Sequence, residues 1–98
     1  MTDQKDDLIA STVFIYKGSK TEVYLYKPKK KWIDGEEFTC KFAIEGQHMR
    51  HIGENIGYDS MQSVILSLYS IGHYLRESED VEQEFIEWPG GKMKFPEI

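Results

Sequence analysis

Between residues 57 and 78, apolar side chains recur at spacings of three and four positions. This spacing places them on one face of an α-helix, and it is the clearest pattern in the chain. Asp59 and Gln62 form a capping pair ahead of it, in which the aspartate accepts a backbone N–H bond and the glutamine reaches back. We predict a long helix here, with a glycine on its apolar face that lets it lie close against a sheet. The predicted face consists of Met61, Val64, Ile65, Leu68, Ile71, Gly72 and Leu75.

Three earlier segments have the composition and alternation of β-strands. Leu8–Lys17 and Thr21–Tyr26 are rich in β-branched and aromatic residues. The Gly-Ser turn signal between them predicts a β-hairpin. In Phe38–Ile44, apolar side chains occur at every second position, which predicts a half-buried strand with Cys40 on its apolar side.

Two weaker strands complete the prediction, one around His48–Ile52 and one around residues 85–88 after the helix. Gly53 and Gly57 are expected to loosen the chain before the helix, and Phe95 is expected to pack back onto the core. The order β-β-β-β-α-β predicts an α+β fold in two layers: an antiparallel four- to five-stranded sheet with one long helix packed on one face. Residues 1–7 are predicted to be a mobile tail and residues 8–98 a single domain.

The 98-residue chain carries a net charge of −5 that is unevenly distributed. Residues 1–31 hold seven lysines and four acidic residues, whereas residues 32–98 hold five basic and thirteen acidic residues. Cys40 is the only cysteine, so no intramolecular disulfide can form, which favours a reducing compartment. The polar N-terminus lacks the apolar core of a signal peptide, and no apolar run approaches the length of a membrane span. These features predict a cytoplasmic protein that does not enter a membrane.

Three motifs resemble a family of small, uncharacterised bacterial domains. They are a strand with an aromatic residue two positions to either side of a cysteine, a Gly-x-Asp-Ser-x-Gln helix start, and an ending with Trp, Gly and Phe-Pro. In this chain they read Phe38-Thr-Cys40-Lys-Phe42, Gly57-Tyr-Asp59-Ser60-Met-Gln62 followed by Val64–Leu68, and Trp88 with Gly90, Gly91 and Phe95-Pro96.

The resemblance covers roughly residues 30–98. It departs at Phe38, where the pattern has Trp, and at Ser63 and Ser67, where the pattern has Ala. The resemblance implies the α+β fold and a bacterial origin, but it implies no reaction. Domains of this kind are similar in size and acidity to the immunity proteins of bacterial toxin systems, a likeness that concerns general properties rather than a site.

The segment from Glu77 to Glu87 holds six acidic residues and no basic one. A solvated surface is the simpler interpretation, but charge of one sign in a short segment also speeds encounter with a basic surface. A nuclease toxin is a natural candidate, because an active site that holds phosphates is basic. Tyr69 and His73 share a second helix face and are suited to anchor a contact. The predicted partner-binding residues are Glu79, Asp80, Glu82, Glu84, Tyr69 and His73.

Other groups of residues favour different functions. Cys40, His48 and His51 are metal-ligand types, but residues three apart in a strand point to opposite faces, and no second cysteine completes a tetrahedral set. A buried Cys40 is expected to have a raised pKa and little reactivity, although a Cys–His nucleophilic pair stays an alternative. Lys27–Lys31 and Trp32 could contact a phosphate backbone and stack a base. Against this, the whole chain is acidic, and a lysine-rich loop commonly protects a sheet edge.

No acid, base and nucleophile can be assembled into a catalytic set, so we predict no enzyme activity, no metal and no cofactor. The leading hypothesis is a non-enzymatic protein-binding module: an immunity or inhibitor protein that neutralises a basic bacterial toxin by occlusion through its acidic surface. One alternative is a small assembly subunit that forms homo-oligomers through a strand edge or through the face of Leu66 and Tyr69. The other is a nucleic-acid-binding domain that uses Lys27–Trp32.

Overall fold

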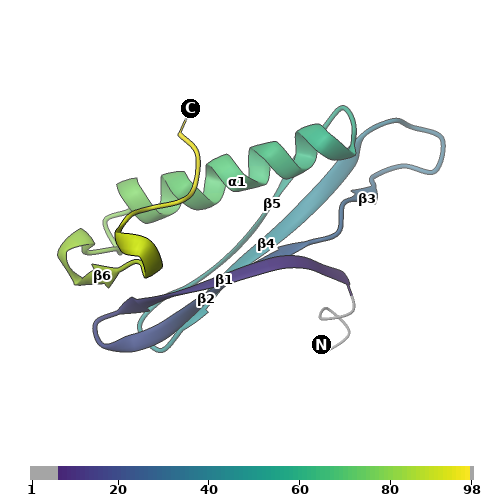
Figure 1. Cartoon of the computed structure of the whole chain (residues 1–98). Helices are drawn as coiled ribbons and strands as arrows, with labels where there is room; N and C mark the ends of the chain where they lie inside the picture. The colour runs from purple at the N-terminus through teal and green to yellow at the C-terminus, as the bar shows by residue number, and fades with distance from the viewer. Residues whose placement is uncertain (1–6, 98) are drawn as a thin grey trace.

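The computed structural model describes residues 7–97, in which a long helix lies across one face of an antiparallel sheet (Figure 1). The C-terminal segment, yellow in the same view, passes across the helix. The strands are β1 (Leu8–Tyr16), β2 (Ser19–Tyr26), β3 (Lys29–Lys30), β4 (Phe38–Gly46), β5 (Arg50–Gly57) and β6 (Ile86–Glu87). The helix α1 spans Ser60–Glu77, and short 3-10 turns cover Gln83–Phe85 and Pro89–Gly91. The predicted α+β class is confirmed.

The sheet has the strand order β5-β4-β2-β1-β6, and the two-residue β3 pairs with the start of β4. All pairs are antiparallel. Lys17 and Gly18 make the turn between β1 and β2 with φ values of 51° and 81°. Positive φ at both turn residues matches the twist of the two strands, which explains the tight hairpin. β6 closes one side of the sheet, and β5 lies at the other.

The core lies between α1 and the face of the sheet that α1 covers. Phe14, Val23 and Phe42 point into it from β1, β2 and β4, and Ile71 and Leu75 point into it from the helix. Each such side chain contributes roughly 1.5–3 kcal/mol when it leaves water. The apolar side of β4 that the alternation predicted is therefore buried against the helix.

The buried face of α1 differs from the predicted one. Met61 and Ile65 are 68% and 40% exposed, whereas Ser63 and Ser67 are fully buried. The cause is Gly57 in β5: a Cβ atom built on it would lie 2.4 Å from the backbone nitrogen of Ser63. Because the first half of the helix lies this close to the strand, only small residues fit between them. The prediction of Met61 and Ile65 as core residues was wrong.

Gly72 is buried as predicted, but it does not face the sheet. A Cβ atom there would lie 2.9 Å from the carbonyl oxygen of Pro96 and 3.1 Å from Cβ of Phe95. Because Gly72 has no side chain, the C-terminal segment can pack directly against the helix. Arg76 fastens the same segment by donating to the carbonyl oxygens of Phe95 and Pro96. The packing of Phe95 against the core is confirmed, with Trp88 at 6.3 Å between ring centroids.

β5 is longer than predicted. We expected a weak strand around His48–Ile52 that loosened at Gly53 and Gly57, but the strand continues through both glycines. Eight consecutive residue pairs with β4 hold it in register. His48 lies in the turn before the strand. The glycines mark close packing against neighbouring groups and not flexibility.

Most of the predicted mobile tail, residues 1–6, lies outside the described residues. Asp7 is described, and its carboxylate pairs with Lys29 at 2.7 Å. Within residues 7–97, no helix combines the length and the apolar character that crossing a bilayer requires.

Candidate functional site

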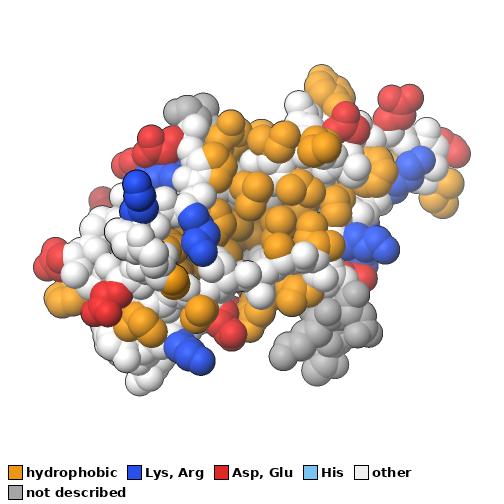
Figure 2. All heavy atoms as spheres, viewed as in Figure 1, with side chains coloured by type: hydrophobic (Ala, Val, Ile, Leu, Met, Phe, Trp, Pro, Cys, Tyr) orange, Lys and Arg blue, Asp and Glu red, His pale blue; other side chains and the backbone are white. Residues whose placement is uncertain are grey.

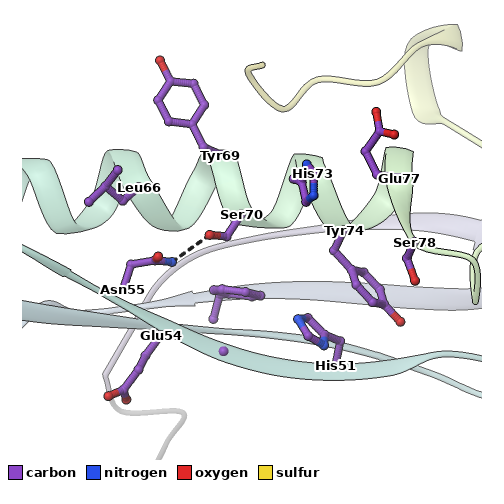
Figure 3. A pocket seen from close by; sticks show the side chains of 12 residues that line it. His51, Glu54, Asn55, Leu66, Tyr69, Ser70, His73, Tyr74, Glu77 and Ser78 are labelled. Carbon is purple, nitrogen blue, oxygen red and sulfur yellow. Dashed lines mark hydrogen bonds between the residues drawn. The ribbon is translucent and has the colours of Figure 1, made fainter. Parts of the chain in front are cut away.

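A groove of about 650 Å³ runs between α1 and the edge strand β5. Figure 3 looks into it, with the helix above and the strand below. Gly53 contributes no side chain, so the ring of Phe42 on β4 forms part of the lining. The lining residues are Phe42, His51, Gly53, Glu54, Asn55, Leu66, Tyr69, Ser70, His73, Tyr74, Glu77 and Ser78.

Two contacts connect the strand to the helix along this groove. Asn55 donates to Ser70 Oγ at 2.9 Å, which is the dashed line in Figure 3, and to Ser67 Oγ at 3.3 Å. The ring of His51 stacks on that of Tyr74, with centroids 4.1 Å apart and planes 3° from parallel. Between these contacts the groove is open above Gly53. The Asn55 hydrogen bonds and the His51–Tyr74 stacking therefore hold the two walls of the groove in place.

The groove contains two of the predicted partner-binding residues, Tyr69 and His73. In Figure 3 Tyr69 points away from the strands, and Glu54 points away from the helix. Glu54 and Glu77 give the lining an acidic character, and no lysine or arginine of the described chain joins them there. Burial raises the pKa of Tyr74, and the charge of Asp80 raises it further. Asp80 therefore lies near this end of the groove.

Two other predicted acids, Glu82 and Glu84, lie at a separate place beside the β1–β2 turn. Glu82 pairs with Lys17 at 2.5 Å, and this hydrogen bond raises the pKa of Lys17. The backbone N–H of Glu82 donates to the hydroxyl of Tyr16 at 3.1 Å, which holds the segment against the core. A shallow hollow here is lined by Lys17, Gly18, Glu82, Glu84, Phe85 and Glu87.

Phe85 stands among these carboxylates with 44% of its surface exposed. The Lys17 ammonium lies 5.5 Å from its ring centroid. Sequence reasoning treated Phe85 only as part of a strand. Its acidic neighbours Glu84 and Glu87 were the sequence signal for this exposure, because a ring that lies between charged residues on a surface segment is expected to stay exposed.

Cys40 is fully buried, and burial raises the pKa of its thiol, as predicted. Ser67 donates to its carbonyl oxygen at 2.9 Å. The two histidines named with it pack on different aromatic rings: His48 lies edge-on to Tyr16 at 6.5 Å, and His51 stacks on the helix. Residues 7–97 contain no group of three side chains that could hold a metal ion.

The lysine-rich segment lies at the end of the sheet beside β4. Lys29 and Lys30 form β3 and pair with Thr39 and Phe38. Lys31 places its ammonium 5.2 Å from the ring centroid of Trp32, which is itself exposed. The sequence predicted a loop here, but Lys29 and Lys30 form a short strand that pairs with the start of β4.

A second hollow, of about 250 Å³, opens between α1, β1 and the C-terminal segment. Figure 2 shows hydrophobic side chains gathered on this face of the molecule. Its apolar lining includes Ala10, Val23, Leu25, Leu68 and Phe95. The half-exposed helix residue Ile65 has the same apolar character, which explains why the predicted helix face extended beyond the buried one.

Comparison with known proteins identifies the family of this chain but finds no similar individual protein. No curated protein and no solved structure matches the chain. A family model described as a domain of unknown function (DUF6968) matches residues 13–97. That range includes β4, β5, α1 and the ending with Trp and Phe-Pro, so it contains all three motifs that suggested a small domain family. The chain belongs to the DUF6968 family.

Proposed function

We propose that this chain is a non-enzymatic protein-binding module that binds a protein with a basic surface through its acidic segment, Glu77–Glu87. The observation that carries the proposal is the exposed Phe85 between Glu82, Glu84 and Glu87. Interfaces commonly combine an aromatic anchor with a surrounding polar rim. The hydrogen bond from Glu82 to Tyr16 supports the proposal, because a segment already held in place loses less entropy on binding.

The more specific form of the proposal is an immunity or inhibitor protein that neutralises a basic bacterial toxin by occlusion. The acidic segment would accelerate encounter with such a toxin and disfavour acidic competitors. A nuclease fits, because the phosphate-binding surface of a nuclease is basic. The small size and net charge of −5 are compatible with this class. We place the protein in the cytoplasm, where a toxin that attacks nucleic acid acts and where the lone Cys40 stays reduced.

A growth-rescue assay tests the immunity role. The chain is co-expressed with the C-terminal domain encoded by the gene immediately upstream, which we expect to be lethal when it is expressed alone. We expect growth to be restored, and the toxin to co-purify with the chain. Continued killing of cells in which both proteins accumulate would refute the immunity role.

Charge reversal tests the surface. The E82K/E84K variant should associate with the toxin at least about tenfold more slowly, because the charges that steer encounter are inverted. The control, D34K/E36K, changes the net charge equally on the distant loop before β4 and should leave the association rate within about twofold. Circular dichroism checks that both variants fold. Equal rates for the two variants would exclude the acidic segment as the interface.

A further inference from the structure

β5 is a long outer strand with one unpaired edge. It spans eight residues, and among the described residues its strand partner is β4 alone. Natural proteins usually protect such edges with a proline, a bulge or a short strand. β5 has no proline, and its register with β4 is unbroken over eight pairs. Alternate backbone N–H and C=O groups along this edge are thus available to another strand.

The outward face of β5 carries a pattern that is complementary to itself. Arg50, Ile52, Glu54 and Ile56 alternate with the residues that face the helix. Ile52 is 57% exposed and Ile56 is 45% exposed. When a second copy of β5 runs antiparallel to the first, the positive residue of each strand faces the negative residue of the other, and the apolar residue between them faces its own copy. Directly opposed residues of antiparallel strands lie on the same face, so these side chains would meet.

We propose that two copies of this chain form a dimer by antiparallel pairing of their β5 strands, with the twofold axis at Ile52. In this register Ile52 lies against the partner's Ile52, and Arg50 lies against the partner's Glu54, twice. An axis at Glu54 would bring two carboxylates together, and an axis at Gly53 would set Ile52 against a carboxylate. Charge complementarity therefore selects the register, and the sheet continues from one subunit into the other.

The inner face of the pairing fits the same register. His51 lies opposite the partner's Gly53, where the missing side chain leaves room beside Phe42. α1 packs on β4 and β5, and neighbouring strands are about 4.8 Å apart. The two helices would then run antiparallel at roughly 10 Å, an ordinary packing distance. The groove between α1 and β5 becomes half of an interface, and Leu66 and His73 lie where the helices meet.

This inference goes beyond the proposed function, because it uses a different surface. Within the acidic segment, Glu82, Glu84 and Glu87 lie with Phe85 beside the β1–β2 turn, whereas Glu77 lines the groove next to β5. A dimer would leave Phe85 and the carboxylates around it accessible on both subunits. The inference also uses one of the two predicted anchor residues, His73, for self-association.

Analytical ultracentrifugation of the full chain tests the dimer. We expect a mass twice that of the 11.5 kDa chain, with a monomer at high dilution. R50E and E54R each place like charges opposite one another twice, and each should weaken the dimer by about tenfold or more. A mixture of R50E with E54R should associate again, since every opposed pair in the mixed dimer is complementary. A wild-type chain that stays monomeric at all concentrations would overturn the proposal.

The mixing experiment separates association from folding. Within each chain Glu45 lies opposite Arg50, and Lys41 lies opposite Glu54. Each reversal therefore disturbs its own subunit equally whether it is alone or mixed, and only the contact between subunits is restored by mixing. A mixture no more dimeric than its components overturns the proposal.

A substitution on the axis gives an independent test. I52D sets two carboxylates opposite one another and should abolish the dimer, whereas I33D makes the same change at an exposed loop isoleucine and should leave it intact. A dimer that survives I52D overturns the proposal. All of these readouts are masses of the isolated chain, so they stand or fall separately from the growth-rescue result.

Discussion

Two glycines of β5 set how closely the layers of this protein approach. At Gly57 an added Cβ would meet the backbone of Ser63 at 2.4 Å, and at Gly53 it would meet Cζ of Phe42 at 2.6 Å. A backbone atom in a helix cannot give way without moving the helix, whereas the far end of a ring can tilt. Replacing Gly57 should therefore destabilise the protein more than replacing Gly53.

We expect G57A to lower the free energy of unfolding by about 3 kcal/mol or more, and G53A by about 1 kcal/mol, because overpacking costs most where the neighbour is rigid. Urea denaturation of both variants measures the difference. The two substitutions are identical in chemistry and lie in the same strand, so each is the control for the other. Equal losses would show that the helix yields as easily as the Phe42 ring.

The tyrosines of the molecule give its stability an alkaline limit. Tyr24 donates to the Glu22 carboxylate at 2.5 Å, and this bond, followed by burial, raises the pKa of Tyr24 from 10.0 to about 12. Burial also raises the pKa values of Tyr26 and Tyr74. A tyrosine whose pKa is higher in the folded protein than in the unfolded chain stabilises the fold. This stabilisation is complete at a pH below the pKa of the unfolded chain, and it is lost as the pH rises through the pKa of the folded protein.

The free energy of unfolding should therefore fall as the pH rises from about 10 toward about 12, because the unfolded chain loses tyrosine protons first. Y24F removes one of these groups and should make the decline shallower. Y58F, at an exposed tyrosine outside the sheet, is the matched control and should keep the wild-type slope. Urea unfolding at several pH values gives the slopes. A wild-type slope in Y24F would contradict the role of the bond to Glu22.

The helix α1 has three faces with different partners. Ser63, Ser67 and Ile71 pack on the sheet, Gly72 and Arg76 contact the C-terminal segment, and the remaining face borders the groove beside β5. Arg76 is central to the second contact, since it donates to two backbone carbonyls and pairs with Glu97 at 3.1 Å. Hydrogen bonds from a charged donor are among the stronger ones, so one side chain can hold the segment in place.

R76A should release the C-terminal segment while leaving the sheet intact. We expect residues 92–97 to be cleaved faster by trypsin, and the free energy of unfolding to fall by about 1.5–3 kcal/mol, the range for hydrogen bonds that involve a charged group. K92A, which removes an exposed basic residue of the same segment, should change stability by less than about 0.5 kcal/mol. Unchanged cleavage in R76A would mean that Phe95 and Trp88 hold the segment without it.

Across the protein, the surfaces divide by chemistry. The acidic segment with Phe85 occupies the end near the β1–β2 turn, the unpaired β5 edge with Ile52 and its flanking charges occupies one side of the sheet, and the lysine-rich β3 occupies the opposite end. A dimer formed through β5 would place two acidic segments on one particle. Two steering surfaces would raise the capture of a basic partner without new contacts.

The sequence by itself determined where the helix and the longer strands of the hairpin and of β4 lie, and that Cys40 is buried. The alternation in Phe38–Ile44, the capping pair of Asp59 and Gln62, and the burial of Cys40 were all readable, because each depends on neighbours within a few residues. The Asp59 carboxylate accepts from the Gln62 backbone at 2.8 Å, as the capping pattern predicts.

The tertiary structure alone decided how those elements meet. Hydrophobic spacing assigned Met61 to the core, but the close approach of α1 to Gly57 buries the small residues Ser63 and Ser67 instead. Gly72 contacts the C-terminal segment and not the sheet. It also decided that β5 is an edge strand and that Tyr69 lies beside a groove while Glu82 lies beside the β1–β2 turn. Such facts depend on contacts between residues far apart in the chain, which local periodicity does not encode.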